Sequence, residues 1–282
     1  MKKDLTIIFV TYYSEKKLLK YLNQFKNIFN VIVIENSQNL KLKEKLKKFS
    51  KTLLILNSKN EGFGCSVNQA LKKVKTKYAL HIDLDTSFSN SSIKKLIKYA
   101  NDINDFAILT PKIKNFFYRN NHFIKKNIYS NVNQMKFIDG CCLLFNIRQF
   151  KKIGFFDKNF FLYYEETDLL KRCVDNSKKI LMIDNLFIKH IGRSSANKKY
   201  NREIELNRNW HYMWSKFYFY KKHYGYFNAF FRIHAHLFSA ILKIFLYFFI
   251  QKNEKRLIYQ HRLSGCINSI LLRRAWYRPK IT

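Results

Sequence analysis

Between about Leu5 and Asp184, short apolar runs alternate with lysine-rich amphipathic stretches, and this alternation constrains the fold more than any other feature. The apolar runs are rich in β-branched and aromatic residues, which is typical of buried strands. They are Leu5–Val10, Val31–Ile34, Leu53–Leu56 and Tyr78–Ile82. The stretch after the first run has helical spacing: Ser14 is a candidate N-cap, and its apolar side chains recur on one face. Strands alternating with helices predict an α/β fold with a mostly parallel sheet.

Each predicted strand is followed directly by polar residues. The four tips are Thr11-Tyr12, Glu35-Asn36-Ser37, Asn57-Ser58 and Asp83-Leu84-Asp85. In open parallel sheets, ligands bind beyond the carboxyl ends of the strands. The tips are therefore expected to share one crevice.

After about residue 200 the chain becomes aromatic and basic, which predicts a domain boundary between residues 1–200 and 201–282. The second part should be mainly helical. Within it, the segment 226–250 is mostly apolar but contains Arg232, His234, His236 and Lys243. Cations near the middle of a bilayer are costly, so an interfacial helix pair is favoured over a simple spanning helix.

The net charge indicates an anionic partner. Lys and Arg number 53 against 19 Asp and Glu, which gives +34, while 47% hydrophobic residues indicate a globular chain. A general preference for lysine in the source genome is the alternative explanation. The five cysteines contain no C-x-x-C pair, and the apolar N-terminal run is too short for a signal peptide, so a reduced, cytosolic chain is expected.

Asp83 and Asp85 form an Asp-x-Asp pair at the end of an apolar strand. Mg²⁺ and Mn²⁺ prefer oxygen ligands and are often held by one or two carboxylates together with substrate phosphates. A solvated acidic pair is the alternative. His190, which ends the apolar run Leu186–Ile188 near Gly192, Ser194 and Ser195, could complete such a metal site or could simply be a packed residue.

The segment Asn60-Glu61-Gly62-Phe63-Gly64 precedes a predicted helix that carries Asn68. Glycines permit close approach of the backbone to a diphosphate, and the first N–H groups of a helix attract anions. An ordinary loop before a helix is the alternative.

Glu165, Glu166 and Asp168 follow the apolar and aromatic run Phe160–Tyr164. Partial burial would raise a carboxyl pKa and suit one of them to act as a general base. The structural alternatives are that Asp168 caps a helix over Leu169–Val174 and that Glu165 pairs with Arg172.

Together, these residues resemble the family 2 glycosyltransferases of GT-A fold, and within them the rhamnosyltransferase-like branch of bacterial polysaccharide synthesis. The similarity runs from about Leu5 to Ser195, with a looser likeness over residues 214–225. It rests on Val10-Thr11-Tyr12, Val33-Ile34-Glu35-Asn36-Ser37, Asn60–Gly64 with Asn68, Asp83-Leu84-Asp85-Thr86, Asp139-Gly140-Cys141, Phe155-Phe156-Asp157, Tyr164-Glu165-Glu166-Thr167-Asp168 and His190-x-Gly192.

The resemblance implies roles for individual residues. Thr11, Tyr12 and Glu35 would hold the nucleoside; Asn60, Gly62 and Asn68 would lie by the nucleotide; and Asp83 would lie at the ribose and the metal. Asp85 would be the direct ligand of Mg²⁺ or Mn²⁺, with His190 a second ligand, and Glu166 falls where the family places its catalytic Asp. Glu35 and Glu166 are each one methylene longer than the usual Asp, and Ala70 replaces a common Gly, so Glu165 and Asp168 remain candidates for the base.

The function implied is an inverting transferase at the inner face of the cell membrane. It would move a sugar, with a rhamnose-like deoxyhexose favoured, from a dTDP- or UDP-sugar to a glycan or lipid-linked acceptor, with the C-terminal region on an anionic membrane surface. The alternatives are a basic nucleic-acid-binding protein and a non-catalytic GT-A scaffold. No nucleic acid is expected as a partner, and a homodimer is left open.

Overall fold

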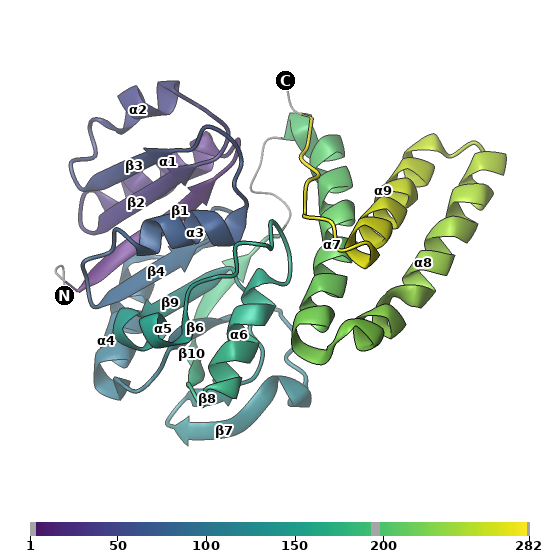
Figure 1. Ribbon diagram of the computed structural model, residues 1–282. Coiled ribbons are helices and arrows are strands. Elements are labelled where there is room, and N and C mark those ends of the chain that lie inside the picture. The colour runs from purple at the N-terminus through teal and green to yellow at the C-terminus, as the bar shows by residue number, and fades with distance from the viewer. Residues whose placement is uncertain (1–3, 193–197, 281–282) are drawn as a thin grey trace. The chain divides into compact units, whose positions relative to one another are not determined.

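The computed structural model describes residues 4–192 and 198–280 (Figure 1). Its internal contacts divide the chain into two units. The first unit comprises Met1–Phe156 and Leu169–Ala196, and the second comprises Asp157–Asp168 and Asn197–Thr282. The acidic segment Asp157–Asp168 therefore groups with the C-terminal helices, whereas the sequence analysis placed it before the boundary expected at residue 200.

The first unit is built on a mixed sheet whose strands lie in the order β3-β2-β1-β4-β9-β6-β10-β8-β7 (Figure 1). The two-residue strand β5 pairs with β10. The four strands predicted from sequence are confirmed as β1 to β4. The strands are β1 (Leu5–Thr11), β2 (Asn30–Glu35), β3 (Thr52–Leu56), β4 (Tyr78–Ile82), β5 (Thr86–Ser87), β6 (Ile108–Ile113), β7 (Phe123–Tyr129), β8 (Val132–Met135), β9 (Cys142–Asn146) and β10 (Ile180–His190).

Strand direction decides which polar tips meet. β3, β2, β1 and β4 are parallel neighbours, so their carboxyl ends lie at one edge of the sheet. β9 runs antiparallel between β4 and β6, so its start, not its end, lies beside the end of β4. β10 is parallel to β6 and brings its own carboxyl end to the same edge.

Helices cover both faces of this sheet. The helices of the first unit are α1 (Glu15–Phe25), α2 (Lys41–Leu46), α3 (Phe63–Leu71), α4 (Asn90–Ile103), α5 (Ile147–Ile153) and the Leu169–Asp175 part of α6 (Glu165–Asp175), with a short 3-10 turn at Asn120–His122. Along β1, Leu5, Ile7 and Phe9 pack with α1, α2 and α4, whereas Ile8 packs with α3, α5 and α6. Both faces being covered explains why the strands are apolar throughout.

The second unit contains α7 (Asn201–Tyr224), α8 (Tyr226–Phe249) and α9 (Asn253–Ile270), preceded by a 3-10 turn at Lys198–Tyr200. This confirms the mainly helical C-terminal region. Met213, Phe217, Ile233 and Cys266 belong to its small core. A Cβ at Gly265 would lie 2.3 Å from the Trp210 carbonyl oxygen, so glycine is what allows α7 and α9 to pack this closely.

Candidate functional site

Asp83, Asp85 and His190 come together at the carboxyl edge of the sheet. The two aspartates follow β4, and His190 ends β10, where it pairs with Thr86 of β5. His190 Nε2 lies 3.4 Å from Asp85 Oδ1 and 4.0 Å from Asp83 Oδ2. The short β5 strand brings residues separated by about a hundred positions into one site, as the sequence analysis expected for strand tips.

A third carboxylate faces the same imidazole. Asp139 Oδ1 lies 3.7 Å from His190 Nδ1 and accepts a hydrogen bond from the Cys141 main-chain N–H at 2.9 Å. The main-chain N–H of Asp83 in turn donates to the Cys141 carbonyl at 2.8 Å. Sequence reasoning quoted Asp139 within a motif but gave it no ligand role, because nothing local showed that antiparallel β9 begins beside the end of β4.

The electrostatics of this cluster favour a cation. Asp85 is 3% exposed, and its hydrogen bond to His190 raises the pKa of that imidazole, with burial opposing and Asp139 and Asp83 adding to the rise. His81, itself buried in β4, contacts Asp83 Oδ1 through Nε2 at 3.0 Å and fixes its orientation. The carboxylates of Asp83, Asp85 and Asp139 therefore all lie next to an imidazole, that of His81 or that of His190.

The donor atoms of this cluster suit a divalent metal ion. One ligand atom each from Asp83, Asp85 and His190 lie within 4.8 Å of one another, and so do atoms from Asp139, Cys141 and His190. Carboxylate oxygen and imidazole nitrogen are ligands that Mn²⁺ accepts. Burial, together with the neighbouring Asp139, raises the pKa of the Cys141 thiol far above its ordinary value. Mg²⁺ and Mn²⁺ prefer oxygen ligands to thiols, so the set of Asp83, Asp85 and His190 suits them better.

Thr11 and Glu35 lie opposite each other at the ends of β1 and β2. Glu35 is 1% exposed, and its Oε1 accepts from the Ser37 main-chain N–H at 2.5 Å and from the Ser37 hydroxyl. Burial raises the pKa of Glu35, against hydrogen bonds from Ser37 and Thr11 that lower it. Tyr12 follows Thr11 and is partly exposed.

The loop before α3 is held by its own polar groups. Asn60 Oδ1 accepts from the Gly62 N–H at 2.9 Å, and Gly62 has a φ of 83°, which favours glycine. Ser66 donates to the Gly62 carbonyl at 2.6 Å and accepts from Asn36 at 2.8 Å. The sequence analysis missed Ser66, which joins the tip of β2 to the start of α3.

Asn68 has main-chain partners on both sides of its amide. It donates to the Phe156 carbonyl at 2.9 Å and accepts from the Phe156 N–H at 3.0 Å. Asn68 therefore ties α3 to the chain just before the acidic segment. The nucleotide contact expected of it stays a prediction.

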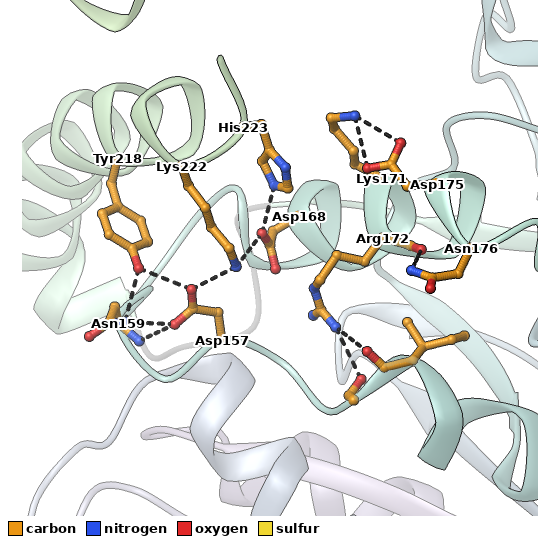
Figure 2. Close-up of polar contacts among 12 residues, drawn as sticks. Asp157, Asn159, Asp168, Lys171, Arg172, Asp175, Asn176, Tyr218, Lys222 and His223 are labelled. Atoms are coloured by element: carbon orange, nitrogen blue, oxygen red, sulfur yellow. Dashed lines mark hydrogen bonds and ion pairs between the residues drawn. The ribbon is translucent and has the colours of Figure 1, made fainter. Parts of the chain in front are cut away.

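In the second unit, Lys222 of α7 bridges the two ends of the acidic segment (Figure 2). Its Nζ lies 2.8 Å from Asp157 Oδ2 and 2.6 Å from Asp168 Oδ1. His223 Nε2 also contacts Asp168 Oδ1, at 2.8 Å, and Tyr218 donates to Asp157 at 3.1 Å. We call Asp157, Asp168, Tyr218, Lys222 and His223 the lysine clasp.

The clasp changes the interpretation of Asp168. This residue is completely buried and lies in the first turn of α6, which begins at Glu165, so it does not cap a helix starting at Leu169 as one alternative held. Its main-chain N–H donates to the Tyr164 carbonyl at 2.8 Å. Asp168 therefore anchors the segment.

Glu165 and Glu166 follow two residues in an unusual conformation. Tyr163 and Tyr164 both have φ of 66°, the left-handed region that bulky residues rarely adopt. The Tyr164 ring packs on Tyr212 and Phe219 of α7, which holds the strained turn in place. Glu165 is buried, whereas Glu166 is partly exposed. Ser194 and Ser195 lie outside the described residues.

The sequence matches the model of glycosyl transferase family 2 over residues 6–181. It is 25% identical over 214 residues to the dTDP-rhamnosyl transferase RfbF of Shigella flexneri, covering 70% of this chain and 72% of that protein. It is 23% identical over 208 residues to the uncharacterized glycosyltransferase MJ1057 of Methanocaldococcus jannaschii, covering 67% and 71%.

Two solved structures share the fold. The mannosyltransferase PcManGT from Pyrobaculum calidifontis in complex with GDP-Man and Mn²⁺ superposes with a TM-score of 0.59 at 10% identity, covering 96% of this chain and 88% of that one. S. aureus TarS 1–349 in complex with UDP superposes with a TM-score of 0.55 at 14% identity, covering 99% and 94%.

Proposed function

The chain belongs to glycosyl transferase family 2, and we propose that it is an inverting enzyme that uses a dTDP- or UDP-sugar. The acceptor is a glycan or lipid-linked oligosaccharide of cell-surface polysaccharide synthesis. The observation that carries the proposal is the cluster of Asp83, Asp85 and His190 at the carboxyl edge of the parallel strands. A rhamnose-like sugar is favoured because RfbF, named as a dTDP-rhamnosyl transferase, is a relative.

In this proposal Asp85 and His190 hold Mg²⁺ or Mn²⁺, with Asp83 shared between the metal and the ribose. The fit rests on ligand atoms within 4.8 Å of one another and on carboxylates that crowd one imidazole. The ion would neutralise charge that builds on the departing diphosphate. His81 and the Cys141 main chain keep Asp83 oriented for either partner.

Thr11, Tyr12 and Glu35 form the proposed nucleoside site. The Glu35 carboxylate is buried at the tip of β2 and can accept the N3–H of a pyrimidine. Uracil and thymine present the same N3–H, so this contact suits UDP and dTDP equally. Asn60 and Gly62 lie in the loop before α3, which we place beside the nucleotide, and Asn68 ties that helix to the Phe156 main chain.

Glu166 is the proposed general base. It takes the proton from an acceptor hydroxyl, whose oxygen forms a bond to the anomeric carbon as the bond from that carbon to the diphosphate oxygen breaks. Attack from the face opposite the nucleotide inverts the configuration. Exposure supports Glu166 over its neighbours, because Glu165 is buried and Asp168 is bonded to Lys222 and His223.

The proposed location is the cytoplasmic face of the membrane, with the second unit on an anionic surface. α8 is long and apolar enough to cross a bilayer by length and composition, but it carries Arg232 and Lys243. An interfacial position keeps both cations near lipid phosphates.

The first experiment measures thermal stabilisation of the purified chain by UDP, dTDP, GDP and CDP, each with and without Mn²⁺. Stabilisation by UDP or dTDP that needs Mn²⁺ is the expected result, and the responding nucleotide then selects the sugars for transfer assays. Stabilisation by GDP alone would contradict the pyrimidine assignment. A response equal with and without Mn²⁺ would contradict the metal assignment.

A further inference from the structure

Six large apolar side chains form a stripe along the outer side of α8. Successive members are four, seven, four, three and four residues apart, which places them on one helical face. They are Phe227, Phe231, Phe238, Leu242, Phe245 and Phe249, with exposures of 79%, 71%, 62%, 69%, 61% and 75%. We call this set the outer stripe.

The opposite side of α8 packs within the second unit. Ala229, Ile233 and Ala240 are its buried residues, and Ala229 and Ile233 join Met213 and Phe217 in the core. The outer stripe is therefore not the core-facing side of the helix. One imidazole interrupts the outer stripe, because the exposed His234 lies between Phe231 and Phe238. An exposed apolar surface of this extent marks an interaction site.

One flank of α8, between the buried side and the outer stripe, is basic. Arg232 and His236 are one turn apart there, and Lys216 of α7 contacts His236, with Nζ 2.7 Å from Nε2. The Arg232 guanidinium lies over the Tyr220 ring at 5.0 Å. Arg262 of α9, held by Asn209 at 2.7 Å, acts electrostatically on His236. We call Lys216, Arg232, His236 and Arg262 the basic cluster.

The basic cluster has no acidic counterpart in the part of the chain that the structure describes. The sequence of α8 contains neither Asp nor Glu, and no ion pair between the described residues involves a member of the cluster. Burial and then Arg232 lower the pKa of Lys216, and burial, Lys216 and Arg262 lower that of His236. Like charges gathered from three helices are relieved by a bound anion.

We propose that the basic cluster binds the phosphate of an anionic phospholipid while the outer stripe of α8 enters the same leaflet. The cluster flanks the stripe along the helix, so phosphate contacts and apolar insertion occur together when α8 lies in the plane of the interface. The inference deepens the membrane association of the proposed function and rests on it. A spanning α8 would carry Arg232 and Lys243 into the hydrocarbon core, which is costly.

Charge also favours lipid over a second copy of the chain. A two-fold pairing of outer stripes would bring the same surface of each protomer together, and with it two basic flanks. Repulsion between these flanks opposes such a dimer, whereas an anionic leaflet attracts both the cluster and the highly positive chain.

Vesicle flotation without nucleotide tests the site directly. The full chain should bind phosphatidylcholine vesicles that contain phosphatidylglycerol and bind pure phosphatidylcholine vesicles far less. The double variant Lys216→Gln/Arg232→Gln should weaken binding to anionic vesicles by roughly 30-fold, since each cation near the surface contributes a factor of about five. The control Lys94→Gln/Lys98→Gln removes two exposed lysines of the first unit and should change binding much less.

A second matched pair tests the outer stripe. Phe231→Ser/Phe245→Ser should abolish most binding, whereas Phe117→Ser/Phe187→Ser removes two exposed phenylalanines of the first unit and should leave it intact. Circular dichroism and thermal unfolding confirm that each variant is folded.

Equal binding to both vesicle types, or equal effects of the cluster variant and its lysine control, would overturn the proposal. So would a dimer in sedimentation equilibrium that is lost in Phe231→Ser/Phe245→Ser while the chain fails to bind vesicles, because a second copy would then occupy the stripe. None of these outcomes depends on nucleotide, so the stabilisation by UDP or dTDP remains a separate test of the proposed function.

Discussion

The carboxylates at the sheet edge of the first unit and those in the lysine clasp of the second have different kinds of partner. At the sheet edge, the imidazoles of His81 and His190 contact Asp83, Asp85 and Asp139. In the clasp, the ammonium of Lys222 neutralises Asp157 and Asp168. In a chain with 53 Lys and Arg, the sheet-edge carboxylates have imidazoles and other carboxylates as neighbours, and in the proposed function they are the ones that bind an external cation. In the same proposal, Asp157 and Asp168, which are bonded to Lys222, have a structural role.

Replacing Asp85 is the strongest test of this contrast. Asp85→Ala should lower transfer by about 1000-fold or more, because charge on the leaving diphosphate would lose its main support. It should also remove the Mn²⁺-dependent part of the stabilisation by UDP or dTDP. Calorimetric titration with Mn²⁺ in the presence of nucleotide measures the loss, and unchanged Mn²⁺ binding would move the metal site elsewhere.

Replacing Glu166 separates catalysis from binding. Glu166→Gln should lower kcat by roughly 1000-fold, within the usual range for loss of a general base, while donor stabilisation persists. The control is Glu165→Gln, which changes a buried neighbour in the same turn. A variant at Glu166 that keeps its turnover, beside an inactive one at Glu165, would reassign the base.

The sheet edge was predictable from sequence because its residues follow apolar runs. Parallel strands place their carboxyl ends together, so Thr11, Glu35 and Asp85 were expected in one crevice, and His190 joined them as the end of another strand. Ser14, which precedes α1 as expected, proved less informative. Its hydroxyl donates to the Tyr12 carbonyl at 2.9 Å and does not cap the helix.

The clasp was beyond sequence reasoning for a physical reason. Lys222 lies 65 positions from Asp157, and among so many lysines nothing local distinguishes it. Asp168 fits the pattern of a helix cap, but the left-handed turn at Tyr163 and Tyr164 starts α6 at Glu165. Both features depend on packing against α7, which only the tertiary structure specifies.

Breaking the clasp should cost stability. Lys222→Ala leaves the completely buried Asp168 with His223 but without its ammonium partner. Because Lys222 is itself exposed, the loss is expected to lower the free energy of unfolding by about 2 kcal/mol, the scale of a hydrogen bond to a charged group. Urea unfolding followed by circular dichroism measures the change. Lys222→Arg should recover part of it, and Lys221→Ala, one position earlier, should have little effect. Equal stability of the two alanine variants would show that the clasp does not hold the segment.

The smallest expected effect concerns Asp157 and pH. Burial raises its pKa, but hydrogen bonds from Lys222, Asn159 and Tyr218 outweigh burial and hold the pKa below its ordinary value. A lowered folded pKa stabilises the native state above the unfolded pKa of about 3.9, and this stabilisation disappears as pH falls through the folded pKa. Asp157→Asn should therefore lower the free energy of unfolding by about 1 kcal/mol at neutral pH, and the gap to wild type should close in acid.

Asp175, paired with Lys171 on the surface of α6, is the matched control (Figure 2). Asp175→Asn should change the unfolding free energy by less than about 0.5 kcal/mol at any pH, because exposed pairs contribute little. If urea unfolding across the acid range gives the two variants the same profile, Asp157 is no better neutralised than a surface acid. The contrast between acids bonded to Lys222 and the carboxylates of the sheet edge would then not hold for Asp157. Asp168 alone of the two clasp acids would keep its structural role.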